Sequence, residues 1–506
     1  MASPSEKLAE SLDLLHNMQE KGIVAIRSAD LTRTHRERLI KNGFLGEVIK
    51  GWYIPSRPDE SAGESTSWYA SFWGFCAAYL NHLKGDRWVL SPEQSLCLHV
   101  ENKSVPRQLL VRAEKARNNI TSLPFDTSLL DIRSTLPEDA NVLEKDGLRI
   151  YTLPAALIAC APGVYQQNSM DVRAALAMIK DGSEILGKLL DGGHSVIAGR
   201  LAGAFRNIGR TKIADEIVQS MKAAGYDVRE SDPFGAPSPV LFEIKEQSPY
   251  VHRIRQMWNA MRGVIIEHFP SPPNRSLDIE IYLKQVEDIY VTDAYHSLSI
   301  EGYRVTRELI EHVRSGDWNP DSSQSDAEHR NALAARGYWQ AHEAVKETIR
   351  KILSGRSAGK SVESDLNIWY RELFAPSVIA GILRPSDLAG YRNHPVYIRH
   401  SMHVPPSIEA VRDAMPALYE LLTEEKEAGV RAVLGHFIFV YTHPLMDGNG
   451  RIGRFLMNAM LASGGYPWTV ITLDDRDMYM AALEQASVHQ NIKPFAQFIA
   501  NLVQAS

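Results

Sequence analysis

The chain has 506 residues, 44% of them hydrophobic and 23% charged, and it carries a net charge of −6. This length predicts roughly two to four domains, and the charge excludes a protein that is polycationic throughout, while leaving room for a local basic patch. Three cysteines, Cys76, Cys97 and Cys160, lie far apart and argue against a disulfide framework or a zinc ribbon. With no signal peptide and no apolar run of about eighteen residues, we expect a cytoplasmic protein that does not enter the membrane.

The first sixty residues predict a small DNA-binding fold. An amphipathic helix ends at Gly22, Ser28 caps a second helix that ends at Gly43, and two apolar stretches about Gly51 form a hairpin. Helix, turn, basic helix and hairpin is the order of a winged helix-turn-helix domain, which we place at residues 1–60. Its candidate DNA contacts are Arg33, His35, Arg36, Arg38 and Lys41 on the second helix, and Lys50 in the wing. The alternative is a solvated basic face on a domain that only packs.

The following region predicts an α+β regulatory domain at residues 67–165. There "WVLSPEQSLCLHV" and "LRIYTLPAALIAC" each run from a strand into a helix, and together with the winged helix they resemble the AbiEi-type antitoxin family of transcriptional regulators. Residues 166–245 predict a helical connector that ends in a proline-rich linker, and residues 246–506 predict an almost wholly helical domain. The expected fold class is therefore mainly α, with an α+β winged-helix region preceding a helical C-terminal domain.

The stretch "HPLMDGNGRIGR" at 443–454 first invites a dinucleotide-binding interpretation. Its glycines spell G-x-G-x-x-G, with an apolar run before them and two acids, Asp474 and Asp475, where a ribose ligand would lie. Several residues separate the apolar run from the first glycine, however, whereas the fingerprint needs the strand to turn directly into it. Two arginines also point into a turn that normally presents bare backbone, and only about thirty residues follow Asp475, too few for a doubly wound sheet. We therefore reject this interpretation.

The same stretch suits a polyphosphate better. Gly448, Asn449 and Gly450 let successive backbone N–H groups turn toward an anion, and the helix that follows adds its N-terminal dipole. Arg451 and Arg454 are three residues apart at the start of that helix, so both side chains can reach the phosphates. The pattern predicts a binding site for a nucleoside polyphosphate.

Two further residues of the stretch predict a reaction at that site. Asp447 offers one oxygen ligand, and Mg²⁺ is commonly held by one carboxylate together with substrate phosphates. His443 is the group near the loop that can accept a proton at neutral pH. The alternative, a glycine turn that caps a helix with surface arginines, leaves both residues unexplained.

Over its whole length the stretch resembles the Fic motif, H-[PX]-[FX]-X-[DE]-G-N-G-R-X-X-R, and departs from it only at Leu445, where phenylalanine is common. Fic enzymes mostly transfer AMP from ATP to a Ser, Thr or Tyr hydroxyl of a protein. The resemblance thus implies ATP as substrate, Mg²⁺ as cofactor and a protein partner, with His443 as general base and Asp447 as metal ligand. The implied phosphate contacts are Gly448, Asn449, Gly450 and Arg451 for the α- and β-phosphates, and Arg454 for the γ-phosphate.

Two other stretches extend the resemblance. "GYRNHPVYIRHSMHVPP" at 390–406 resembles the family's flap, a β-hairpin that covers the nucleotide and pairs with the target segment, placed before a helix that starts near Ser407. The flap residues expected nearest the nucleotide are Ile398, Arg399, His400 and Ser401. An ordinary surface hairpin is the alternative. Tyr479 lies in "RDMYMAALEQA", which resembles the region flanking the adenine pocket, although Met480 replaces a second tyrosine often found there.

The stretch "SLSIEG" at 297–302 resembles the family's inhibitory pattern, [ST]-x-x-x-E-[GN]. Ser297 and Glu301 are four residues apart and share a helix face, and the resemblance implies that Glu301 pairs with Arg454 in the seat of the γ-phosphate. ATP would then bind with its α-phosphate misplaced for attack. Gly302 is expected to permit a close backbone approach. A solvated helix face is the alternative, and in some family members the same glutamate positions water to hydrolyse an AMP–protein adduct.

We therefore expect a self-inhibited protein adenylyltransferase whose protein substrate is unknown. The resemblance is consistent with a homodimer, and the N-terminal winged helix predicts DNA as a second partner. The rival hypothesis is a DNA-binding transcriptional regulator or antitoxin-like protein whose helical half senses a nucleotide. Intact His443 and Asp447 favour the enzyme, because a sensor needs neither a base nor a metal ligand.

Overall fold

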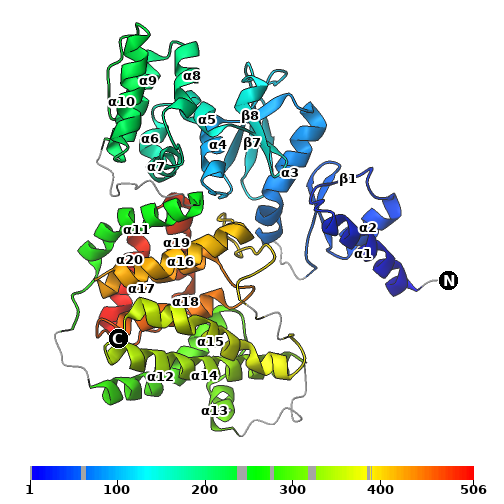
Figure 1. The fold of residues 1–506 in the computed structure, drawn as a ribbon. Helices are drawn as coiled ribbons and strands as arrows, with labels where there is room; N and C mark the ends of the chain where they lie inside the picture. The colour runs from blue at the N-terminus through cyan, green and yellow to red at the C-terminus, as the bar shows by residue number, and fades with distance from the viewer. Residues whose placement is uncertain are drawn as a thin grey trace. The chain divides into compact units, whose positions relative to one another are not determined.

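The computed structural model describes residues 3–58, 64–235, 248–273, 278–316, 326–384, 388 and 390–506. Contacts divide the chain into two compact units (Figure 1). Unit 1 comprises Met1–Pro249 together with Tyr397–Val404, and unit 2 comprises Tyr250–Val396 together with Pro405–Ser506. Within the described residues every strand lies in unit 1, and the chain is mainly helical, as the sequence predicts.

Unit 1 begins with two helices and a three-stranded sheet. These elements are α1 (Pro4–Glu20), β1 (Ile26–Arg27), α2 (Arg33–Lys41), β2 (Leu45–Ile49) and β3 (Trp52–Pro55). The sheet order is β1-β3-β2, both pairs are antiparallel, and Gly51 takes a left-handed conformation in the predicted hairpin turn. The cap of α2 is Thr32, whose side chain accepts a hydrogen bond from the His35 amide. The prediction of Ser28 as this cap is wrong, because the Ser28 hydroxyl donates instead to the Gly51 carbonyl.

The next region of unit 1 along the chain combines a mixed sheet with helices. It comprises α3 (Thr66–Lys84), β4 (Trp88–Leu90), α4 (Pro92–His99), β5 (Gln108–Ala113), β6 (Ile120–Ser122), β7 (Ser128–Arg133), β8 (Val142–Lys145), β9 (Leu148–Tyr151) and α5 (Leu153–Ala159). One sheet has the order β4-β5-β7-β6, and β8 pairs with β9. The passages from β4 into α4 and from β9 into α5 confirm the two predicted strand-to-helix turns. The buried rings of Trp68, Phe72 and Phe75 fill the core beside the sheet.

Unit 1 continues through a run of helices, as the helical period of this region predicts. They are α6 (Val164–Gln167), α7 (Ser169–Ala177), α8 (Ser183–Asp191), α9 (Ser195–Asn207) and α10 (Thr211–Ala223). The proline-rich linker predicted after them falls largely outside the described residues, since residues 236–247 are not among these.

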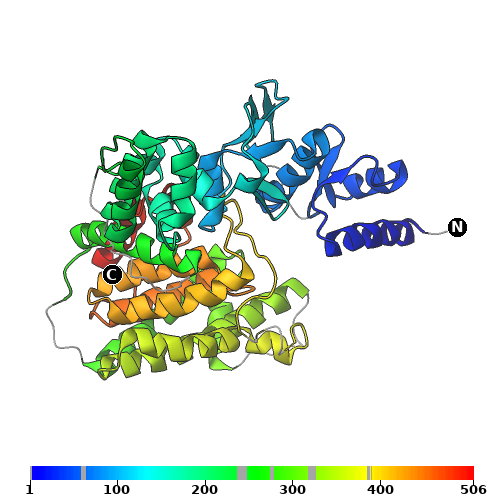
Figure 2. The same cartoon turned by 45° about the horizontal axis from the view of Figure 1, so that its top comes forward.

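Unit 2 is built from helices alone within its described part, and several of them run alongside one another (Figure 2). They are α11 (Pro249–His268), α12 (Ile279–Ile300), α13 (Arg307–Ser315), α14 (Asp326–Leu353), α15 (Ala358–Ile379), α16 (Ile408–Glu424), α17 (Ala428–Thr442), α18 (Asn449–Ala462), α19 (Arg476–His489) and α20 (Lys493–Ala505). Almost every residue of α17 and α18 is buried, which makes them the central pair of the unit. Helices α14 and α15 approach closely at Gly337, where a Cβ atom would lie 2.0 Å from the Leu373 carbonyl oxygen.

Two segments differ from what their sequences suggest. The run "WTVITLDD" at 468–475 contains no strand, and the apolar residues 437–441 belong to helix α17, which fits the rejection of a dinucleotide fold. The prediction of a β-hairpin flap at 390–406 is wrong, because these residues contain no strand. Within unit 1 the carbonyl of Met402 instead accepts a hydrogen bond from the Val105 amide at 2.8 Å. The helix after this segment begins where expected, with Ser407 as its cap.

Among the helices that the structure describes, none combines the length and the apolar character needed to cross a membrane.

Candidate active site

His443 lies at the end of helix α17. The helix is buried through Thr442, and His443 follows as its C-cap with φ 49° and ψ 58°, a left-handed conformation that is uncommon for a residue with a side chain. Two residues later, Leu445 is fully buried. Leucine therefore serves as the apolar anchor of the loop at the position where the motif commonly has phenylalanine.

The protonation state of His443 is set by its surroundings. Its Nδ1 lies 3.1 Å from the Val440 carbonyl, and because a carbonyl only accepts, Nδ1 carries the proton and Nε2 keeps a free lone pair. Burial is the largest cause that lowers the pKa of His443 to about 4. The hydrogen bond to Val440 opposes it, the charge of Arg392 adds to it, and the charges of Glu301 and Asp447 raise the pKa slightly. His443 is therefore neutral at pH 7 and able to accept a proton at Nε2.

Two residues, Arg392 and Asn449, hold the loop that follows His443. Arg392 donates from its backbone amide to the Pro444 carbonyl and from Nε to the His443 carbonyl, both at 2.8 Å. The Asn449 side chain accepts from the Leu445 amide at 2.9 Å and donates to the Leu445 carbonyl at 2.8 Å. Asn449 thus braces the loop with its side chain, which leaves only its backbone amide for a phosphate. Sequence reasoning missed Arg392, because no local pattern connects it to a histidine about fifty residues away.

Helix α18 begins directly after this loop, and its N-terminus is the expected binding site for an anion. Gly448 is its N-cap with φ 77°, a left-handed conformation that glycine adopts without strain. The first amides of a helix have no partner within the helix, and they carry the positive end of its dipole. A Cβ atom placed on Gly450 would lie 2.3 Å from Oε1 of Glu301, so a carboxylate already lies against this helix end.

Arg454 connects α18 to the stretch at 297–302. Its Nη2 donates to Glu301 Oε1 at 2.7 Å and to the Ser297 carbonyl at 3.0 Å, while its Nε donates to the Ser297 hydroxyl at 2.8 Å. Its third nitrogen, Nη1, is buried and has no hydrogen-bond partner in the part of the chain that the structure describes. An unpartnered guanidinium nitrogen beside a helix N-terminus fits a phosphate oxygen.

The two partners of this ion pair differ in their freedom to move. The Arg454 side chain is 4% exposed and the Glu301 side chain 29% exposed. Partial burial would raise the pKa of Glu301, but the charges of Arg454 and Arg451 outweigh this effect and lower it, so the carboxylate is ionised at neutral pH. Arg454 is fixed in the core, whereas Glu301 can leave toward solvent.

Glu301 is the C-cap of α12, and Gly302 follows it with φ 87°. The amide of Gly302 donates to Ser299 and the amide of Tyr303 to Leu298, which closes the helix end. The expectation that Gly302 permits a close backbone approach is wrong, because a Cβ atom there would meet nothing within 4 Å. Glycine is needed at this position for its left-handed backbone, which turns the chain just after Glu301.

Arg451 and Asp447 form the outer part of the site. The guanidinium of Arg451 lies between two rings, 5.2 Å from the centroid of Tyr303 and 5.1 Å from that of Phe374, and its side chain is 2% exposed. Its Nη2 is 3.5 Å from Oδ2 of Asp447, which is 66% exposed. The described residues contain no group of three or more His, Cys, Asp or Glu side chains that could hold a metal. Asp447 fits a Mg²⁺ ion that takes its remaining ligands from phosphates and water.

Tyr479 does not line an open pocket. Its ring is buried against Phe495 and Phe498, and its hydroxyl lies 2.8 Å from Nε2 of His436. Burial raises the pKa of Tyr479 to about 12, so the phenol stays protonated. It belongs to the core beside Arg454, and a base-stacking role for it stays a prediction.

The remaining predicted residues lie in unit 1. Nε of Arg399 pairs with Glu64 at 2.9 Å, and His400 has a left-handed backbone with φ 60°. The neighbouring flap residues Ile398 and Ser401 belong to the same segment of unit 1. The structure therefore places these four side chains among the contacts of unit 1, and their role at a nucleotide stays a prediction.

The basic residues of α2 differ in whether their side chains are bound to other groups of the protein. Arg36 donates to the Ser28 carbonyl and Arg38 to the Lys7 carbonyl, whereas Arg33 pairs with Glu37 on the surface at 2.7 Å. The side chain of Lys41 is exposed. Among these four basic residues of α2, Arg33 and Lys41 are thus the more accessible ones.

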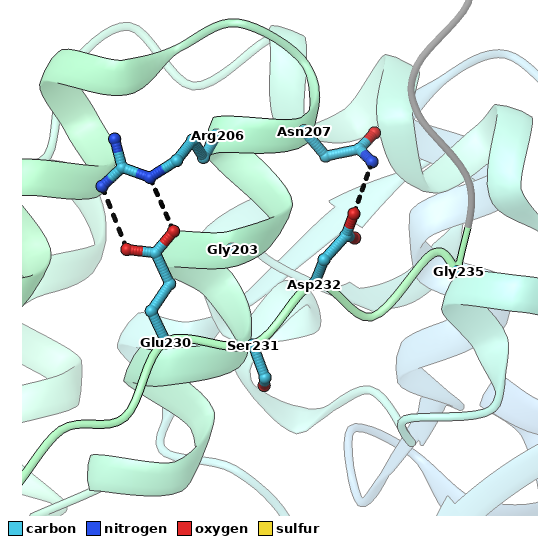
Figure 3. A pocket seen from close by; sticks show the side chains of 7 residues that line it. All are labelled: Gly203, Arg206, Asn207, Glu230, Ser231, Asp232 and Gly235. Carbon is cyan, nitrogen blue, oxygen red and sulfur yellow. Dashed lines mark hydrogen bonds and ion pairs between the residues drawn. The ribbon is translucent and has the colours of Figure 1, made fainter.

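A surface pocket of about 590 Å³ lies in unit 1 against α9 (Figure 3). Its charged and amide groups are paired with one another: Arg206 donates to Glu230 at 2.6 Å, and Asn207 donates to Asp232 at 2.8 Å. None of the candidate residues lines it. We therefore assign the candidate active site to the loop between α17 and α18.

A family model matches this chain in its C-terminal half, and curated proteins and solved structures are also similar to the chain. Residues 364–461 match the model of the Fic/DOC family. The protein adenylyltransferase Fic of Nematostella vectensis is 30% identical over 43% of this chain and 48% of its own length, and that of Aedes aegypti is 29% identical over 44% and 42%. A solved structure of a Fic-1 fragment from C. elegans is 18% identical, with a TM-score of 0.37 over 67% of this chain and 96% of that chain.

The chain spans about half the length of the curated relatives that it matches. The family match includes α17, α18 and the loop between them, where His443, Asp447 and the two arginines lie. Residues 364–461 of this chain are therefore similar to the Fic/DOC family, and the curated relatives that match the chain are named protein adenylyltransferase Fic.

Proposed function

We propose that this protein transfers AMP from ATP to a hydroxyl group of a protein substrate, and that Glu301 holds it inactive. The observation that carries the proposal is the joint position of a neutral His443 and a buried Arg454 about the N-terminus of α18. Nε2 of His443 is free to accept a proton, and Nη1 of Arg454 is unpartnered in the described residues. A base beside an anion site is the arrangement that hydroxyl-to-phosphorus transfer requires.

The proposed reaction balances as a single displacement. The oxygen of the target hydroxyl attacks the α-phosphorus of ATP, a new oxygen–phosphorus bond forms, and the bond from that phosphorus to the bridging oxygen breaks. Pyrophosphate leaves, and the proton of the hydroxyl passes to Nε2 of His443. Asp447 would hold Mg²⁺, which when bound supplies positive charge against the phosphates. Because His443 is neutral at physiological pH, it needs no prior deprotonation.

The proposed nucleotide site follows from the charges and donors at the start of α18. The amides of Asn449 and Gly450 are proposed to meet the α- and β-phosphates, since the first amides of a helix have no partner within it. The Gly448 amide donates to Oδ1 of Asp447 at 2.6 Å and would reach a phosphate only after leaving that oxygen. Arg451 adds a fixed positive charge that its two aromatic neighbours hold without neutralising it. Arg454 offers Nη1 to the γ-phosphate.

Inhibition follows from competition for Arg454. The Glu301 carboxylate bonds to Nη2 of Arg454 and lies against Gly450. A γ-phosphate carries the same sign of charge and needs the same donors, so both groups cannot occupy this place together. A nucleotide that binds beside Glu301 is shifted from the geometry for in-line attack. Departure of Glu301 would restore the seat without moving Arg454.

The same contacts are compatible with the reverse direction as a second activity. The charge of Glu301 acts on His443, which places the carboxylate near the proposed base. A carboxylate there can orient a water molecule for hydrolysis of an AMP–protein bond. Wild-type protein incubated with an AMP-labelled target decides this point: release of AMP that depends on Glu301 identifies the hydrolase.

Labelling with ATP that carries an α-phosphate label tests the main proposal. Wild type, Glu301→Gly and the double variant Glu301→Gly/His443→Ala are incubated with Mg²⁺ and a cell lysate. We expect protein-bound label only with Glu301→Gly. The matched control is Glu424→Gly, which removes an exposed glutamate from the end of another helix, α16, and should remain as silent as wild type. Absence of label with Glu301→Gly contradicts the proposed transfer, and equal label in wild type contradicts the inhibition.

A further inference from the structure

Helix α12 presents a stripe of three polar residues toward the core. Asp293, Ser297 and Glu301 are spaced four residues apart and therefore follow one another along one face. Asp293 and Ser297 are 4% and 1% exposed, so burial forces both to find partners within the protein. Ser297 and Glu301 contact Arg454 directly, whereas Asp293 bonds to a residue of another helix.

That residue is Tyr338 of α14. Its hydroxyl donates to Oδ2 of Asp293 at 2.7 Å, and the same hydroxyl lies within hydrogen-bonding reach of the Ser297 side chain. Tyr338 is fully buried, and its ring packs against Phe455 of α18, the residue after Arg454. The hydroxyl therefore lies between the acidic and the serine parts of the stripe.

The side chains of Arg454, Ser297, Tyr338 and Asp293 form a row in which the donor of each hydrogen bond can be identified. The Tyr338 hydroxyl donates its one proton to Oδ2 of Asp293. The Tyr338 oxygen is then left to accept from the Ser297 hydroxyl, and the Ser297 oxygen accepts from Nε of Arg454 at 2.8 Å. The row runs from the guanidinium through two hydroxyls to a buried carboxylate, and each bond polarises the next.

We propose that Tyr338 and Asp293 are positioning residues that keep Arg454 aimed at the γ-phosphate of ATP after Glu301 has left. This inference rests on the proposed function. Of the three hydrogen bonds that Arg454 donates to α12, two go to Ser297 and one to Glu301. Loss of Glu301 removes only the bond that competes with the nucleotide. The row through Ser297, Tyr338 and Asp293 holds the guanidinium in place, while Nη1 stays unpartnered within the described residues and Nη2 keeps only its bond to the Ser297 carbonyl.

The row should affect the binding of ATP and ADP differently. Arg454 meets the third phosphate, so its position affects ATP and not ADP, whose two phosphates lie at the amides of α18. Weakening the row should therefore lower the affinity for ATP selectively. A defect in folding or packing would lower the affinity for both nucleotides or reduce the amount of folded protein.

Calorimetric titration of the full-length Glu301→Gly protein with ATP and with ADP tests this inference. Adding Tyr338→Phe keeps the ring and removes only the hydroxyl, and we expect it to weaken ATP binding roughly ten-fold while ADP binding changes by less than about two-fold. The matched control is Tyr290→Phe. Tyr290 is a buried tyrosine of α12 whose hydroxyl has no partner in the described structure, so its loss should change neither affinity.

A second variant covers the case in which Tyr338→Phe does not fold. Asp293→Asn keeps an oxygen that accepts from Tyr338 but replaces the carboxyl group with an amide, and we expect a smaller selective loss of ATP affinity, roughly three-fold. An unchanged ATP-to-ADP affinity ratio in the folded variant overturns the role of the row. Failure of Glu301→Gly itself to bind ATP overturns the proposed function, and this inference with it.

Discussion

Two arginine-bearing helices of this protein differ in what their charges are free to do. In α2, Arg36 and Arg38 donate to backbone carbonyls. At the start of α18, Arg451 is held by two rings and Arg454 keeps one buried nitrogen without a partner in the described residues. The number of basic residues in a stretch thus does not identify an anion site. Burial, a helix N-terminus and unsatisfied donors do, because an unpaired buried donor is costly until a ligand meets it.

The largest expected effect concerns the base beside α18. In the Glu301→Gly background, His443→Ala should lower the rate of AMP transfer by a factor of about 10²–10⁴, since the proton of the target hydroxyl loses its acceptor. The rate is measured by incorporation of label from ATP into protein. The control is His489→Ala, which removes an exposed histidine at the end of α19 and should leave the rate unchanged. A His443→Ala rate within about three-fold of its parent contradicts the role of the base.

The next effect compares the two arginine regions directly. In the Glu301→Gly background, Arg454→Ala should weaken ATP binding by a factor of about 10–100, because a charge-assisted contact to the γ-phosphate is lost. Arg38→Ala should not change ATP binding, since that guanidinium is bound to Lys7 and Ser11 in unit 1. Calorimetric titration with ATP measures both. Equal affinities for the two variants would show that Arg454 is not a phosphate ligand.

A smaller effect is expected at α2 if its exposed charges bind DNA. Replacing Arg33 and Lys41 together by alanine should lower the affinity for a DNA duplex roughly three- to ten-fold and reduce its salt dependence, because phosphate contacts are lost. Arg36→Ala should have less effect on the salt dependence, since Arg36 is bound to the Ser28 carbonyl. Fluorescence anisotropy at two salt concentrations gives both quantities. Wild-type protein that does not bind DNA at low salt removes this role altogether.

The smallest expected effect is that of pH on the rate of AMP transfer near neutrality. The pKa of His443 is lowered to about 4, so the base stays neutral down to that pH, and the rate of Glu301→Gly should be nearly flat from about pH 6 to 8 and fall only as pH approaches 4. The pKa of Glu301 is also lowered, so its carboxylate stays ionised and wild type should remain inactive over the same range. A pH profile of both proteins checks this. Activation of wild type at pH 6 would contradict an ion pair that persists there.

The local arrangement of the candidate site residues could be predicted from the sequence. The residues of 443–454 lie on one loop and the start of one helix, so their spacing alone places the proposed base, metal ligand and phosphate donors together. The four-residue spacing of Ser297 and Glu301 likewise put both side chains on one helix face, and both contact Arg454 in the structure. The succession of helices was readable for the same reason, because apolar periodicity is a local property.

The distant residues that support the candidate active site can be identified only from the tertiary structure. Arg392 bonds to the His443 carbonyl, and Tyr338 bonds to Asp293, although each pair is separated by more than forty residues and follows no spacing rule. The segment 390–406 looked like a hairpin, yet its Met402 carbonyl bonds to Val105 of unit 1. Strand pairing and buried polar contacts depend on which partner the fold brings near, and a pattern of neighbours in the chain does not contain that information.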